Sequence, residues 1–146
     1  YNATYAHAGY ASEYDVKSVN DALEDAANQL YGVVGDVADA PTQRQIVDDN
    51  PLVLGMDEPH PKGARAGLVW LDFRHLPADA PPQIVGHTRH NSVTQKGAVI
   101  CENVVRNTTD TPGGEAVLVE TPDTITVLRR ETDDAVSQRA LQTERS

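Results

Sequence analysis

The first clear pattern in the chain is that of an amphipathic helix. Between residues 15 and 34 apolar side chains recur every three or four positions, and acidic residues fill the positions between them. Asp15 or Ser18 could cap the start of this helix, and Gly35 could cap its end. The pattern therefore predicts one long helix with a single face for the core.

The next segment, residues 36–67, is rich in proline and glycine. A short helix is expected over residues 41–48, because Pro41 suits the first turn of a helix. The remainder is expected to be a long loop, and long ordered loops often have a function.

Elsewhere the pattern changes to that of strands. Short apolar or alternating runs predict strands over 2–9, 67–73, 83–87, 97–103, 115–121 and 123–130. The last two are separated by a tight-turn composition, so we expect them to form a β-hairpin. The polar stretch 131–146 is expected to be a frayed or weakly helical tail.

A helix followed by a series of strands in 146 residues is most simply one α/β domain. We expect this domain to cover residues 1–130 and the tail to follow it. The composition, with 39% hydrophobic and 23% charged residues, is that of a folded globular chain.

The charge balance argues against one class of partner. Twelve basic and 22 acidic residues give a net charge of −10, so we expect no broad nucleic-acid surface, which would need clustered Lys and Arg. Few lysines and many aspartates favour a halophilic, cytoplasmic protein, and a merely acidic protein is the alternative. No apolar run approaches the roughly 20 residues of a membrane helix, so no membrane is expected as a partner. The single cysteine, Cys101, excludes an internal disulfide and a multi-cysteine zinc site.

Two histidines end strand-like runs beside a glycine, His7 in YAHAG and His87 in VGHTR. Strand ends that open into loops are where α/β folds gather ligands from distant parts of the chain. Imidazole is a common metal ligand, and a neighbouring glycine leaves room for a metal or a substrate. A metal site fits this pattern, although purely structural histidines are commoner.

The order AHAG, a helix, an irregular excursion, LVWLDF, IVGHTR and NTTDTPGGEAVLVE resembles the C-terminal half of a calcineurin-like metallophosphoesterase. The serine/threonine protein phosphatase and diadenosine tetraphosphatase branch is the most similar, over about residues 3–130. The resemblance implies part of a four-layer α/β/β/α sandwich, with a mixed sheet and a C-terminal β-hairpin. Residues 1–130 would then be the C-terminal portion of a phosphoesterase domain.

The resemblance also implies a chemistry. His7 and His87 would ligate one metal in a centre of two divalent ions, which could be manganese, iron or zinc. The whole enzyme would hydrolyse a phosphate ester or anhydride with a metal-activated hydroxide. Apart from the resemblance, Arg89 stands next to His87 and is a candidate for binding a phosphate of the substrate with its planar fork, and an exposed salt bridge is the alternative. No residue of this chain is predicted to act as a catalytic acid or base.

Further positions match the motifs of the family without being ligands. Gly86 and Thr88 would shape the loop that presents the second histidine. Asp110, Gly113 and Gly114 would belong to the turn before the closing hairpin, in a structural role.

The other motifs of that family, Asp-x-His, Gly-Asp-x-x-Asp and Gly-Asn-His, should precede His7 and do not occur. The chain alone would supply only part of an active site, and its start at Tyr1 is expected to mark a truncated chain. The rival hypothesis is a non-catalytic half-domain that acts as an interaction module. A third hypothesis is that the chain is a small acidic structural domain. The substrate could be a phosphoprotein, a dinucleoside polyphosphate, a nucleotide or a simple phosphomonoester.

Several other residues are weaker candidates. His90 is expected to lie at the surface, and Trp70 is expected to pack in the core. A substrate-contacting role is weighed against a solvated loop for His60, Lys62, Arg65, Arg74 and His75.

Overall fold

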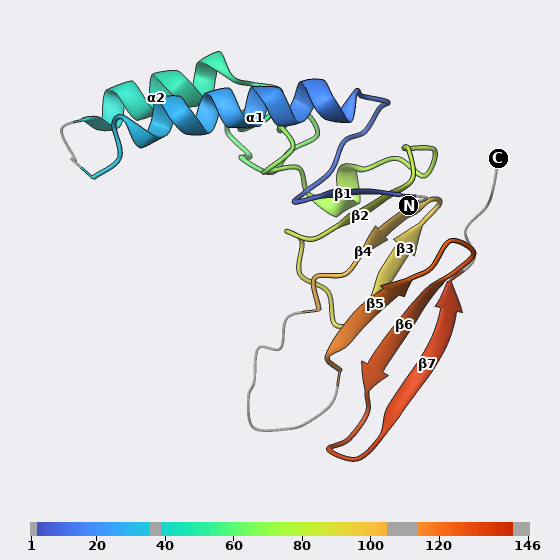
Figure 1. The fold of residues 1–146 in the computed structure, drawn as a ribbon. Helices are drawn as coiled ribbons and strands as arrows, with labels where there is room; N and C mark the ends of the chain where they lie inside the picture. The colour runs from blue at the N-terminus through green and yellow to red at the C-terminus, as the bar shows by residue number, and fades with distance from the viewer. Residues whose placement is uncertain (1–2, 36–38, 105–113, 142–146) are drawn as a thin grey trace.

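The computed structural model describes residues 3–35, 39–104 and 114–141. The elements are β1 (Thr4–Ala6), α1 (Val16–Tyr31), α2 (Ala40–Asp49), the 3-10 helix η2 (Phe73–His75), β2 (Gln83–Val85), β3 (Thr94–Lys96), β4 (Val99–Cys101), β5 (Ala116–Glu120), β6 (Ile125–Arg130) and β7 (Val136–Leu141). They form a mixed α/β fold with two sheets (Figure 1). In the described part, no helix is both long and apolar enough to cross a membrane.

The first sheet has four strands in the order β1-β2-β4-β3. The strands β1, β2 and β4 are parallel, and β3, which the sequence pattern did not predict, runs antiparallel to β4. Ala6 lies opposite Val85, which lies opposite Cys101. The carboxyl ends of the three parallel strands therefore meet at one edge of a mixed sheet.

The second sheet has the order β5-β6-β7, and its strands are all antiparallel. The predicted hairpin, β5 with β6, is confirmed. The expectation of a frayed or weakly helical tail is wrong for β7, which pairs with β6 along its whole length. Only Leu141 of this strand is buried. Because backbone pairing rather than apolar alternation defines β7, its sequence gives little sign of a strand.

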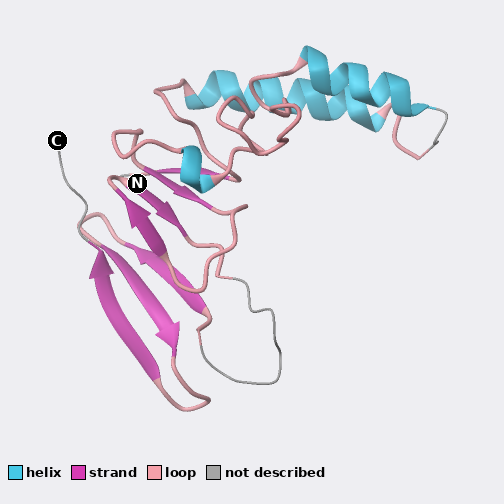
Figure 2. Cartoon of the chain, turned by 180° about the vertical axis from the view of Figure 1, so that it is seen from behind, coloured by secondary structure: helices cyan, strands magenta, loops and turns pink. Residues whose placement is uncertain are grey.

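The core lies on both faces of the four-stranded sheet. The three-stranded sheet lies beside this sheet, and the helices α1 and α2 lie at the other end of the molecule (Figures 1 and 2). One face packs on the three-stranded sheet, with the buried contacts made by Ile84, Ile100, Ile125, Val127 and Leu141. The other face packs on the segment that contains η2, through Leu71, Phe73, Leu76, Val85, Val99 and Cys101. A third cluster joins α1 to the loops, through Tyr10, Val19, Ala26, Val53 and Leu68.

Both predicted helices are confirmed, with a shift at one end. Asp15 caps α1 by accepting a hydrogen bond of 2.8 Å from Ser18 N. The helix ends at Tyr31 with Gly32 as its C-cap, so it stops before the expected Gly35. Pro41 lies in the first turn of α2, as predicted.

The strand predicted over 67–73 is wrong. Trp70 N and Leu71 N both donate to Gly67 O, which forms a turn, and η2 begins at Phe73. Instead, the backbone at the start of this segment lies against the preceding loop. Leu68 N donates there to Leu52 O over 3.1 Å. A short apolar run does not distinguish a strand from a buried turn, because both need every side chain covered.

Candidate functional site

The two histidines singled out in the sequence meet at the carboxyl edge of the four-stranded sheet. His7 directly follows β1, and His87 follows β2 after one residue. His7 Nε2 and His87 Nδ1 are 3.1 Å apart although 80 positions separate the residues in the chain. Their ring centroids are 5.0 Å apart at 66°. Parallel strands thus place both imidazoles at one point, as the sequence predicted for strand-end ligands.

The backbone that presents the second ring is unusual. His87 has a φ of 54°, a conformation that costs energy for most residues other than glycine. Gly86 has no such φ, and a Cβ there would meet His7 O at an ordinary 3.4 Å. That this glycine leaves room for a metal or a substrate stays a prediction, because this contact concerns only the protein's own atoms. The strained residue is the histidine itself.

Two neighbouring groups hold this turn in place. Asn103 Nδ2 donates to His87 O over 3.0 Å. Cys101 Sγ lies 3.4 Å from Gly86 O and 3.3 Å from Thr88 O. Both groups come from the end of β4 or directly after it, so the third parallel strand supports the histidine on the second.

Thr88 ties the same turn to the opposite side. Its Oγ1 accepts a hydrogen bond of 2.8 Å from Phe73 N, at the start of η2. The ring of Trp70, in the turn before η2, meets that of His87 edge-on, with centroids 5.9 Å apart. The histidine turn is therefore held between β4 and the segment 70–73.

The electrostatic setting favours the neutral form of the second imidazole. Burial lowers the pKa of His87, and its neighbours Lys62 and His7 lower it further. Its Nε2 atom is buried and has no hydrogen-bond partner in the described part. The nitrogen of His87 that faces His7 is the other one, Nδ1, which lies at hydrogen-bond distance from His7 Nε2. A neutral imidazole is the form that binds a metal ion.

The distance between the two rings also suits a shared metal ion. With typical metal–nitrogen distances of about 2.1 Å, nitrogens 3.1 Å apart subtend an angle of about 95° at the metal, which is a normal angle for adjacent ligands. Within the described ranges, however, no three His, Cys, Asp or Glu side chains gather to hold a metal. The residues fit one side of a coordination sphere, and the two-metal centre stays a prediction.

Arg89 lines the same cavity as the two histidines. A cavity of about 700 Å³ is lined by His7, His87, Arg89, Glu102, Asn103 and β5 residues 116–118. Arg89 is exposed and makes no ion pair with the residues that the structure describes. The expected alternative, an exposed salt bridge, is thus not seen for this side chain.

The remaining motif residues have different outcomes. Asp110 and Gly113 lie outside the described residues. Gly114 has a φ of 92°, and its N donates to Arg130 O over 2.7 Å, which starts the hairpin. His90 is half-buried with its ring 5.2 Å from that of Phe73, so the expectation of a surface residue is wrong.

The weaker candidates fall into two groups. His60, Lys62, Arg74 and His75 line one cavity with Trp70. Trp70 itself is half-buried against the core, as expected. Arg65 instead pairs with Asp57, at 2.8 Å, and does not line that cavity.

Asn103 was missed by sequence reasoning. Its signal was the polar pair Glu102-Asn103 directly after the buried run of β4, in the same position relative to its strand as the histidines. An amide that supports a turn has no motif of its own, so only the strand order reveals its place.

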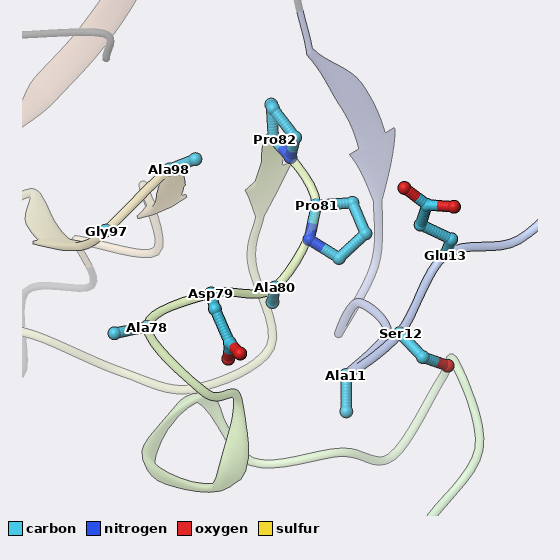
Figure 3. A pocket seen from close by; sticks show the side chains of 10 residues that line it. All are labelled: Ala11, Ser12, Glu13, Ala78, Asp79, Ala80, Pro81, Pro82, Gly97 and Ala98. Carbon is cyan, nitrogen blue, oxygen red and sulfur yellow. The ribbon is translucent and has the colours of Figure 1, made fainter. Parts of the chain in front are cut away.

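A further hollow lies at the opposite end of the sheet (Figure 3). Pro81 and Pro82 precede β2 there, and the carboxylates of Glu13 and Asp79 stand on different segments of the wall. No Lys, Arg or His is among the described residues that line it. This hollow is unsuited to an anionic ligand, in contrast to the two cavities described above.

Comparison with known proteins adds no relative: no protein-family model, no curated protein and no solved structure matches the chain.

Proposed function

We propose that this chain is part of a metal-dependent phosphoesterase, in which His7 and His87 hold one metal ion. The observation that carries the proposal is the approach of the two ring nitrogens to 3.1 Å at the carboxyl ends of adjacent parallel strands. The resemblance in sequence and the nearby arginine support it. The same proposal includes a four-layer α/β/β/α sandwich whose other part supplies the remaining metal ligands.

Two further residues of the cavity, Arg89 and Asn103, have a part in this proposal. Two divalent ions, manganese, iron or zinc, would polarise the phosphate and lower the pKa of a bound water. Arg89 binds a phosphate oxygen pair with its fork, since charge-assisted bonds of this kind orient a substrate. Asn103 fixes the backbone of His87, so that the ring keeps its direction without a ligand. The substrate is a phosphate ester or anhydride.

Metal affinity tests the proposal directly. Titration of the chain with Zn²⁺ or Mn²⁺ should show binding, and His7→Asn and His87→Asn should each weaken the metal affinity by more than about 100-fold. Replacing a residue that only hydrogen-bonds to a metal ligand already lowers the metal affinity about 10- to 100-fold. His75→Asn removes an exposed imidazole elsewhere and serves as the matched control. In the whole enzyme that the proposal implies, phosphatase turnover should fall with metal affinity in both histidine variants. Unchanged metal affinity in either variant contradicts the proposal.

The interaction module remains a second candidate because of one surface. Val117, Val119 and Val136 are 59%, 42% and 66% exposed, and the strand register puts them on one face of the three-stranded sheet. An exposed apolar face of this kind is typical of a protein contact. Light scattering over a range of concentrations tests it, with Val117→Thr as the comparison. A monomer at every concentration argues against this function.

A further inference from the structure

A second cavity lies beside Trp70, and neither His7 nor His87 is among its described lining residues. Its volume is about 900 Å³, and its walls include Met56, His60, Lys62, Trp70, Arg74 and His75. The residues come from the irregular segment before η2 and from η2 itself. A cavity of this size accommodates a small organic ligand.

The polar lining of this cavity favours an anion. In a chain with a net charge of −10, two cations and two imidazoles face one space. Lys62 makes no ion pair or side-chain hydrogen bond within the described residues. Arg74 is 72% exposed and only loosely paired with Asp72, at 3.6 Å.

The one carboxylate among the described lining residues does not cancel this charge. Asp57 accepts hydrogen bonds from Arg65 N and Nε, at 3.1 and 3.0 Å. These bonds lower the pKa of Asp57 and occupy both of its oxygens. Lys62 and Arg74 are therefore left to interact with a ligand.

The lining of the cavity also includes apolar groups, the half-buried side chains of Trp70 and Met56. An indole face stacks well on flat rings, and a thioether adapts to their edges. A ligand that used both kinds of group would carry a flat ring and an anionic group a short distance apart.

We propose that this cavity binds an aryl phosphate or phosphonate, with its ring on Trp70 and its anionic group between Lys62 and Arg74. The N–H groups of His60 and His75 suit the further oxygens of a tetrahedral anion. The proposal does not rest on the phosphoesterase function, because it needs neither the histidine pair nor a metal.

Phenylphosphonate is a direct probe, because its carbon–phosphorus bond is not cleaved by ester hydrolysis. The chain has one tryptophan, so tryptophan fluorescence reports on Trp70 alone. With a chelator present, phenylphosphonate should change this fluorescence in a saturable way. Inorganic phosphate, phenol and benzoate should bind more weakly. Equal affinity for inorganic phosphate overturns the role of the ring, and equal affinity for benzoate overturns the choice of a phosphate-type anion.

Charge-removing variants locate the bound anion. Lys62→Gln should weaken phenylphosphonate binding about tenfold, which is the typical effect of losing one charge-assisted hydrogen bond. Lys17→Gln removes the same charge on α1, in a pair with Asp21, and should leave the affinity unchanged. His7→Asn should also bind phenylphosphonate normally. No saturable change, or equal affinities in Lys62→Gln and Lys17→Gln, overturns the proposal, while loss of binding in His7→Asn moves the ligand to the histidine pair.

Discussion

Gln83 and Tyr10 exchange two hydrogen bonds in the core. Tyr10 N donates to Gln83 Oε1 over 2.9 Å, and Gln83 Nε2 donates to Tyr10 O over 2.7 Å. The side chain of Gln83 is 0% exposed. Gly9 has a φ of 97°, and a Cβ there would lie 2.6 Å from Gln83 Oε1. The first residue of β2 thus fixes the loop that follows His7.

Replacing this amide should cost much of the stability of the chain. Gln83→Leu leaves a buried N–H and C=O of Tyr10 without partners, so we expect the free energy of unfolding to fall by about 2–4 kcal/mol. Gln45→Leu changes an exposed glutamine on α2 in the same way and should cost less than about 0.5 kcal/mol. Urea unfolding measures both. Equal midpoints would show that the buried bonds contribute little.

The loop around Leu52 approaches the turn at Gly67 closely, and alanine substitutions at Gly67 and at Gly32 test this contact. A Cβ on Gly67 would lie 2.6 Å from Pro51 O and 2.9 Å from Leu52 O, and backbone atoms cannot move aside easily. Gly67→Ala should therefore destabilise the chain by about 2–3 kcal/mol. Gly32→Ala, where φ is −70° and the nearest atom is 3.5 Å away, should stabilise it by about 0.4–1 kcal/mol. Thermal unfolding of the two variants should shift in opposite directions.

Lys96 has a structural role that its charge does not suggest. Its Nζ donates to the carbonyl oxygens of Phe73, Arg74 and Leu76, at 3.1, 3.0 and 2.8 Å. Lys96→Met keeps the length of the side chain but loses these bonds at the end of η2, and should cost about 1.5–3 kcal/mol. Lys17→Met, on the exposed side of α1, is the control and should be nearly neutral. A similar effect of both changes would rule out the carbonyl contacts as the cause.

The pH dependence of stability should carry the signature of one histidine. The pKa of His87 lies below its ordinary value of 6.5 in the folded chain, mainly because of burial. The unfolded chain therefore binds the proton more readily, and the free energy of unfolding should decrease as the pH falls from about 6.5 to the lowered pKa. Above that window His87 has no such effect.

His87→Asn isolates this contribution, since asparagine tolerates a positive φ better than most residues. With a chelator present, the wild-type chain should lose more stability than the variant between about pH 7.5 and pH 5. Parallel curves for the two proteins would mean that the ring titrates alike in both states.

Much of the fold could be predicted from local patterns. The helix from residue 16 shows in its apolar spacing and in Asp15, because a cap and a periodic face are local properties. The hairpin of β5 and β6 shows in two strand-like runs around a turn. The place of His7 and His87 at strand ends could be read in the same way.

The rest depended on pairings between distant segments. Nothing in the residues near Val136 indicates β7, since its partner β6 supplies the hydrogen bonds. The turn at Gly67 forms because the loop around Leu52 lies against it. Asn103 reaches His87 only because β4 lies beside β2. Such contacts follow from strand order, which a single sequence does not state.

The position of Cys101 makes its rate of thiol labelling a measure of how often the sheet opens. Its thiol is fully buried behind the histidine turn, and burial raises its pKa, so a thiol reagent can react only while the turn or the sheet is open. As Cys101 is the single cysteine, the labelling rate relative to that of a small thiol gives the fraction of time spent open. A labelling rate that does not change at low urea concentrations indicates a local opening at the site. A labelling rate that rises steeply with urea concentration indicates unfolding of the whole sheet.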